Sequence, residues 1–166
     1  MAEIKLGENT VHTSGNLPEV GGDAPDATLV AQDLSEVVLS SYTGKRVVLN
    51  IFPSIDTGVC AASVRKFNEE AAGLDNTVVV NVSVDLPFAL KRFCGAEGIE
   101  NAVSLSAFRH DSFENGYGVT MIDGKMKGFF SRAVVVVDEK GDVLHTEQVP
   151  QIGQEPNYEA ALAILS

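Results

Sequence analysis

Three stretches of the chain are almost continuously apolar and rich in β-branched residues. They are residues 47–52 (VVLNIF), 77–84 (TVVVNVSV) and 133–138 (AVVVVD). A strand that faces water on one side alternates apolar and polar positions, and such alternation is largely missing from these runs. They therefore predict strands buried on both faces, as in a parallel sheet covered by helices.

The residues between the first two runs carry a helical pattern instead. Over residues 60–74 the apolar side chains recur at helical spacing, and Gly73 and Asn76 are candidate stop signals. This pattern predicts a strand, helix, strand unit. The apolar positions that define the helix are Val64, Phe67, Ala71 and Leu74.

A second, shorter helix is predicted after the second apolar run. Asp85 is a residue type that caps helix N-termini, and Pro87 fits the first turn of a helix. Gly95 is a candidate stop signal for this helix. The helix expected between these residues carries Cys94.

The two ends of the chain complete the predicted fold. Residues 139–142 form a turn signal before the β-prone segment 143–149, which predicts an antiparallel hairpin. A helix is expected after Pro156, and residues 3–13 predict a small N-terminal β-hairpin. Because no repeat or linker divides the sequence, we expect one α/β domain over residues 1–166, with a central β-sheet and helices on both faces.

Composition limits the classes of partner. The net charge of -11 argues against binding to nucleic acid or to an anionic membrane surface, since both are bound through basic patches. No apolar stretch approaches the roughly 18 residues that a membrane-spanning helix needs. The first residues, MAEIKLGENTVH, lack the basic and apolar regions of a secretory signal, so a cytoplasmic location is expected.

Cys60 stands at the predicted start of the first helix, where chemistry is favoured. Unpaired backbone N–H groups and the positive end of the helix dipole favour a thiolate over a thiol. Thr57 lies three residues upstream and can place a hydroxyl near the sulfur, while Pro53 can supply an apolar wall that limits water. The alternative is that Cys60 is a small residue of the core.

The second cysteine does not form a local motif with the first. Cys60 is followed by Ala61, Ala62 and Ser63, so the C-x-x-C arrangement of thioredoxin-type dithiols is absent. The histidines are scattered through the sequence and give no ligand-spaced cluster for a metal. If the fold allows the two cysteines to meet, Cys94 could form a disulfide with an oxidised Cys60. The histidines are His12, His110 and His145.

The residues around both cysteines resemble a known family. PSIDTGVC holds Pro53, Thr57 and Cys60 in the P-x-x-x-T-x-x-C pattern of peroxiredoxins, and the strings NIFPSIDTGVCAASVRKFN and SVDLPFALKRFCGAEGI resemble bacterial thiol peroxidases, which are atypical two-cysteine peroxiredoxins. The resemblance continues through FRHDSFENGYGV, KGFFSRAVVVVD and EPNYEAALAIL, so it covers nearly the whole chain. One departure is DAPDATLV, because peroxiredoxins often carry an aromatic residue soon after the Ala-Pro pair and this chain has Ala27, Thr28 and Leu29 there.

The resemblance implies a fold, an activity and a set of site residues. The fold would be thioredoxin-like, with a central mixed sheet flanked by helices. Cys60 would be the peroxidatic cysteine and Cys94 the resolving one, with Thr57, Pro53 and Arg132 completing the pocket. The activity would be reduction of hydrogen peroxide and organic hydroperoxides in antioxidant defence, with thioredoxin as reductant, a homodimer as the assembly and no metal, haem or flavin.

Two other functions fit the same residues. A redox sensor would begin with the same reactive thiolate and use the disulfide to change a partner surface. A domain whose cysteines form a structural bridge is the second alternative, although a chain of 166 residues can build a core without one. Sustained peroxide consumption would distinguish the enzyme from both.

Overall fold

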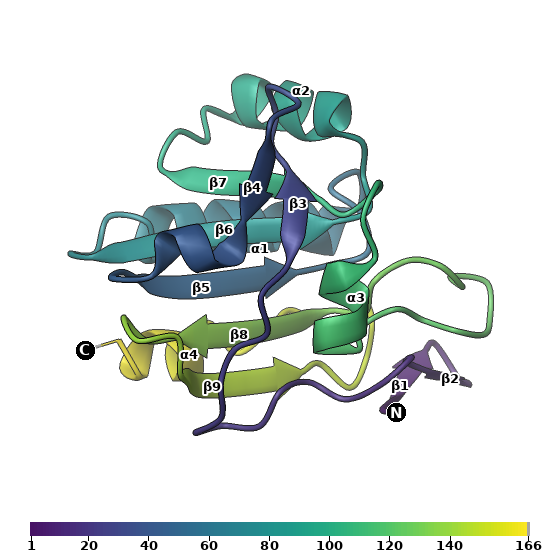
Figure 1. Cartoon of the computed structure of the whole chain (residues 1–166). Coiled ribbons are helices and arrows are strands. Elements are labelled where there is room, and N and C mark those ends of the chain that lie inside the picture. The colour runs from purple at the N-terminus through teal and green to yellow at the C-terminus, as the bar shows by residue number, and fades with distance from the viewer. Residues whose placement is uncertain (166) are drawn as a thin grey trace.

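The computed structural model describes residues 1–165, and its centre is a mixed seven-stranded sheet (Figure 1). The three valine-rich runs form neighbouring strands, β5 (Arg46–Ile51), β6 (Thr77–Ser83) and β8 (Ala133–Val137), as predicted. β5 and β6 are parallel, whereas β8 is antiparallel to β5, so the expected parallel pairing is wrong for β8. A continuous apolar run reports burial on both faces of a strand, which β8 has, and does not report its direction.

The other strands extend the sheet on both sides. β9 (Val143–Gln148) pairs antiparallel with β8, which confirms the predicted hairpin. β7 (Ala102–Ser106) lies parallel to β6, and β3 (Thr28–Val30) and β4 (Glu36–Val38) continue the order to β4-β3-β7-β6-β5-β8-β9. β7 was not predicted, because its sequence, AVSLS, is short and contains two serines.

Helices cover both faces of the sheet. α1 (Gly58–Glu70) and α4 (Tyr158–Ala163) pack on one face through a shared apolar cluster that includes Phe67 and Ala161. The 3-10 helix η1 (Leu39–Tyr42) and helix α3 (Ser112–Tyr117) contribute to the cluster on the opposite face. α1 and α4 confirm the predicted helices, although α1 ends before the predicted stop signals.

The predicted ends of the helix that carries Cys94 need correction. α2 (Pro87–Glu97) has Leu86 at its N-cap position with no side-chain cap bond, so Asp85 does not cap it. Gly95 lies inside the helix. The helix ends at Gly98, whose φ of 67° is the left-handed conformation in which glycine commonly ends helices.

The predicted N-terminal hairpin is present. β1 (Glu3–Leu6) and β2 (Asn9–His12) form a separate two-stranded sheet. Figure 1 shows this hairpin beside the body of the molecule, below the long loop that leads from α3 to β8. Its buried side chains, Ile4 and Val11, pack against Met121 and Ile152. Among residues 1–165, no helix has the length and apolar character to cross a membrane.

Candidate active site

Cys60 lies in the first turn of α1, which follows β5 after the loop of residues 52–57. Its side chain is fully buried and packs in an apolar cluster with Phe52, Ile55, Val64 and Leu90. The first turn of a helix has backbone N–H groups without intrahelical partners, and these favour negative charge. The carbonyl of Cys60 points along the helix and accepts a hydrogen bond of 2.8 Å from the hydroxyl of the next buried serine in α1.

A buried cation contacts the sulfur of Cys60. Arg132 precedes β8, the strand beside β5, and is only 3% exposed. Its Nη1 donates to Cys60 Sγ at 3.2 Å, and its Nε and Nη2 both donate to the carbonyl of Ile152, at 2.9 and 2.8 Å. The guanidinium is therefore fixed by three hydrogen bonds, one of which places its positive charge against the Cys60 sulfur.

Pro53 and Thr57 lie in the loop that joins β5 to α1. Pro53 is buried, as a wall residue would be, whereas Thr57 is exposed at the N-cap position of α1. The Thr57 hydroxyl donates to the carbonyl of Ser54 at 2.9 Å. The loop thus brings Pro53 and Thr57 to the start of the helix that carries Cys60, with the hydroxyl engaged by the loop itself.

Asp85 holds this loop in place, a role that the sequence did not indicate. Its carboxylate accepts hydrogen bonds from the Ser54 hydroxyl, the Ile55 backbone N–H and the Ser83 hydroxyl, each 2.7 Å long. Asp85 was predicted to cap the helix that follows it, but its carboxylate is bonded to the loop before Cys60. A carboxylate after a strand is compatible with both arrangements, so no sequence signal separates them.

Cys94 lies on the buried side of α2, 6% exposed. Its Sγ is 3.5 Å from the hydroxyl of Ser104 in β7. Both cysteines are free thiols, as expected of the reduced form. The structure therefore places Cys60, Arg132, Pro53 and Thr57 around one helix start and keeps Cys94 on a separate helix.

A row of buried polar side chains crosses three strands beneath the two helices. Asn50, Asn81 and Ser104 occupy paired positions of β5, β6 and β7. The amide of Asn50 donates to Ser63 Oγ in α1 at 3.2 Å and to Asn81 Oδ1 at 3.0 Å, and Asn81 donates to Ser104 Oγ at 3.3 Å. The row ends at Cys94, so hydrogen bonds connect α1 with the second cysteine.

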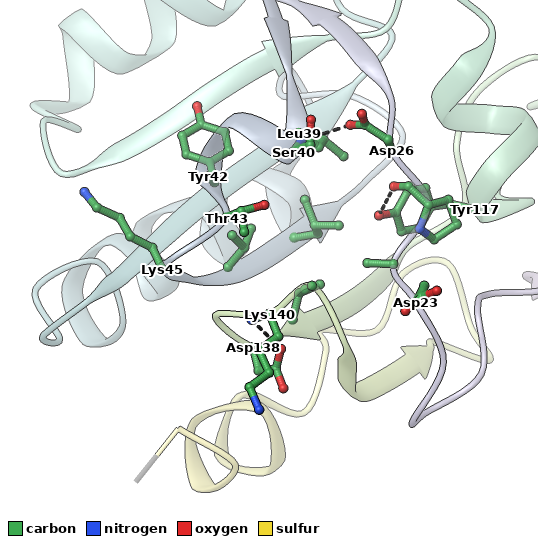
Figure 2. A pocket seen from close by; sticks show the side chains of 16 residues that line it. Asp23, Asp26, Leu39, Ser40, Tyr42, Thr43, Lys45, Tyr117, Asp138 and Lys140 are labelled. Atoms are coloured by element: carbon green, nitrogen blue, oxygen red, sulfur yellow. Dashed lines mark hydrogen bonds between the residues drawn. The ribbon is translucent and has the colours of Figure 1, made fainter.

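A separate hollow lies at the other end of β5. It has a volume of about 230 Å³, and Figure 2 shows polar side chains, including Asp26, Tyr42 and Lys140, arranged around it. Its apolar lining includes Val47 and Leu49, and neither Cys60 nor Arg132 lines it. In the described part of the chain, no three His, Cys, Asp or Glu side chains are grouped to hold a metal ion.

Comparison with known proteins agrees with this geometry. The family model described as Redoxin matches residues 19–162. A thiol peroxidase from Mycobacterium bovis is 57% identical over 165 residues, which are 99% of this chain and 99% of the relative. The crystal structure of a peroxiredoxin-like protein from Aquifex aeolicus matches with a TM-score of 0.92 at 38% identity, over 98% of this chain and 95% of that chain.

A more distant structure supports the fold. A thiol peroxidase from Chromobacterium violaceum matches with a TM-score of 0.90 at 21% identity, over 98% of this chain and 94% of that chain. Together the fold and the helix-start cysteine define a thioredoxin-like protein of the peroxiredoxin type. The chain belongs to the redoxin family, which confirms the family and the fold predicted from the sequence.

Proposed function

We propose that this chain is a thiol-dependent peroxidase that reduces hydrogen peroxide and organic hydroperoxides to water and alcohols, with Cys60 as the nucleophile. The observation that carries the proposal is the 3.2 Å contact between Arg132 Nη1 and Cys60 Sγ at the start of α1. A thiolate beside a fixed guanidinium and a helix N-terminus is a strong nucleophile toward an O–O bond. The thiol peroxidase from Mycobacterium bovis, similar over the full chain, supports this activity.

In the first step the Cys60 thiolate attacks the terminal oxygen of ROOH. The S–O bond forms, the O–O bond breaks, and the leaving oxygen takes the bonding pair and a proton, which gives ROH and a sulfenic acid at Cys60. Arg132 and the backbone N–H groups of the first turn of α1 stabilise the negative charge on the leaving oxygen. Because Cys60 is fully buried, one of the segments packed around it must move for peroxide to reach the sulfur.

In the second step Cys94 attacks the Cys60 sulfur. The S–S bond forms, the S–O bond breaks, and water leaves, so one disulfide stores the two oxidising equivalents. A disulfide needs Cα atoms within about 7 Å, and the two cysteines start on different helices, with the Cys60 sulfur at Arg132 and the Cys94 sulfur at Ser104. Part of α2 must therefore unwind to bring Cys94 to Cys60.

An external dithiol completes the cycle, and thioredoxin is the proposed reductant. We also propose a cytoplasmic homodimer that contacts its partner near the active-site loop. Leu86 and Phe88 support this arrangement, because they are 51% and 65% exposed next to Asp85, whose carboxylate holds that loop. Apolar side chains of this size in water are typical of a surface that binds another protein.

The test follows peroxide consumption by wild type, Cys60→Ser and Cys94→Ser, each supplied with thioredoxin, thioredoxin reductase and NADPH. Cumene hydroperoxide and hydrogen peroxide are assayed in parallel. We expect sustained turnover by wild type, no reaction of Cys60→Ser, and a single oxidation of Cys94→Ser before it stalls. A parallel assay with dithiothreitol separates loss of peroxidase chemistry from a wrong choice of reductant.

The redox-sensor function predicts a different result. A sensor would consume about one equivalent of peroxide per chain and stop, even with dithiothreitol present. That outcome for wild type would reject the peroxidase. Turnover with dithiothreitol but not with thioredoxin would reject only the proposed reductant.

A further inference from the structure

The guanidinium that contacts Cys60 is held mainly by a backbone group. Two of the three hydrogen bonds donated by Arg132 go to the carbonyl oxygen of Ile152, and the third reaches the sulfur. A guanidinium presents its N–H donors in a rigid, planar fork. The position of the Ile152 carbonyl therefore decides where the third donor points.

The segment that contains Ile152 is bound to the N-terminal hairpin. The backbone N–H of Lys5 in β1 donates to the carbonyl of Pro150 at 2.8 Å, and the N–H of Ile152 donates to the carbonyl of Lys5 at 2.9 Å. The side chain of Gln151 is hydrogen-bonded in both directions to the backbone of Gly7, at 3.2 and 3.3 Å. Residues 150–152 thus pair with β1 like a short parallel strand.

Apolar packing fixes the same segment. The Ile152 side chain is 9% exposed and packs with Ile4 of β1, Val11 of β2 and Met121. These residues form a small core of their own, distinct from the two clusters on the faces of the main sheet. The hairpin is therefore the element against which both the backbone and the side chain of Ile152 are placed.

We propose that the β1–β2 hairpin is a positioning element for catalysis, which acts through the Ile152 carbonyl on the guanidinium of Arg132. Neither the hairpin nor Ile152 supplies a reacting group. A shift of the carbonyl would turn the Arg132 fork away from Cys60 Sγ, and misplacement by about 1 Å can cost about a hundredfold in rate. This inference rests on the proposed role of Arg132 in the peroxidase reaction.

The experiment compares two equal truncations in buried valines. Val11→Ala removes two methyl groups from the hairpin core, and Val143→Ala removes the same groups from β9; the two valines are 2% and 1% exposed. Val143 pairs with Val137, at the opposite end of β8 from Arg132, so it controls for loss of stability alone. Arg132→Lys keeps the positive charge but removes the planar fork of N–H donors, so it is the reference for complete loss of that fork.

Two rate constants are measured for Cys60 in a Cys94→Ser background, in which Cys60 is the one remaining cysteine. One is oxidation by hydrogen peroxide and the other is alkylation by iodoacetamide, at one pH. Alkylation also needs access to a thiolate but develops no oxyanion that Arg132 would stabilise. The ratio of the two constants therefore reports the placement of Arg132 and cancels changes in access.

We expect Arg132→Lys to lower the ratio most, Val11→Ala to lower it about tenfold, and Val143→Ala to leave it unchanged. An equal ratio in Val11→Ala and Val143→Ala overturns the positioning role. An unchanged ratio in Arg132→Lys instead contradicts the role of Arg132 in the proposed function. If Val11→Ala does not fold, Ile152→Val replaces it, because it removes one methylene group from the same core. Ile152→Val should then lower the ratio, and a ratio equal to that of Val143→Ala would overturn the positioning role.

Discussion

Cys60 and Cys94 are almost equally buried, 0% and 6% exposed, yet their neighbours differ in kind. The sulfur of Cys60 accepts a hydrogen bond from a guanidinium, whereas the sulfur of Cys94 faces only a serine hydroxyl. Burial therefore does not separate the proposed nucleophile from the proposed resolving thiol. The nearby cation does, because in the proposed reaction it can stabilise the leaving oxygen.

The two helices also differ in what lies beneath them. α1 buries five residues, including Cys60, Val64 and Phe67, whereas α2 buries three, Pro87, Leu90 and Cys94. The row of polar side chains on the sheet ends under Cys94. α2 therefore loses less apolar contact on leaving the sheet than α1 would. The comparison predicts that α2 moves and α1 stays during disulfide formation.

The largest expected effect comes from removing the cation. Arg132→Gln should lower the rate of Cys60 oxidation by peroxide about a hundredfold, the scale seen when one donor to a developing oxyanion is lost. Stopped-flow oxidation measures this rate. Arg46→Gln is the matched control, because Arg46 donates to backbone carbonyls at the other end of β5, and it should oxidise at the wild-type rate. Equal losses in both variants would contradict the comparison.

Asp85 should give the next effect, because it links the Cys60 loop to the strand before α2. Asp85→Asn places an NH₂ group against donors that now meet a carboxylate. We expect a loss of about 1–3 kcal/mol in the free energy of unfolding and a slower first oxidation. Urea unfolding and stopped-flow oxidation give the two values. Ser35, bonded to Asp33 on the exposed surface, offers the control Ser35→Ala, which should change neither.

A pair of serine variants tests the polar row on each side. Ser104→Ala removes the hydroxyl that holds Cys94 Sγ against β7 and should speed disulfide formation about twofold to tenfold, since a hydrogen bond that must break contributes about 0.5–1.5 kcal/mol. The first oxidation should not change. Ser63→Ala, which removes the hydroxyl bonded to the Cys60 carbonyl, should leave disulfide formation at the wild-type rate. Quenched samples resolved by mass after alkylation measure both steps.

The smallest effect is a pH dependence of the hairpin that supports Arg132. A side-chain hydrogen bond raises the pKa of His12 above 6.5 and lowers the pKa of Asp123 below 3.8. The stability that His12 contributes is fully present below pH 6.5 and is lost as pH rises through the raised pKa of His12. The stability that Asp123 contributes is present above pH 3.8 and is lost as pH falls through the lowered pKa of Asp123. The pair should stabilise the fold most between about pH 4 and 6.5.

His12→Gln removes this dependence. Urea midpoints at pH 5.5 and pH 8 should differ less in His12→Gln than in wild type. If the urea midpoint decreases from pH 5.5 to pH 8 by the same amount in wild type and in His12→Gln, the exposed pair contributes nothing measurable to stability.

The sequence predicted what depends on local pattern. The valine runs gave β5, β6 and β8 because burial on both faces demands apolar side chains, and Cys60 was expected at a helix start. The contact of Arg132 with Ile152 could not be predicted, because a backbone carbonyl has no sequence signature. Asp85 was assigned to the wrong neighbour for a related reason: two of its three donors, Ser54 and Ile55, lie about 30 residues upstream and meet its carboxylate only in three dimensions.

The hollow beside β5 has a practical consequence for inhibitor discovery. Its volume of about 230 Å³ is below the roughly 300–1,000 Å³ of pockets for drug-sized ligands, so the hollow has room for a fragment only, while Cys60 is fully buried. A fragment that binds in the hollow would raise the melting temperature without touching Cys60. Such binders would stabilise the chain without slowing peroxide reduction, so their value would be as anchoring fragments or labels and not as blockers of the thiol.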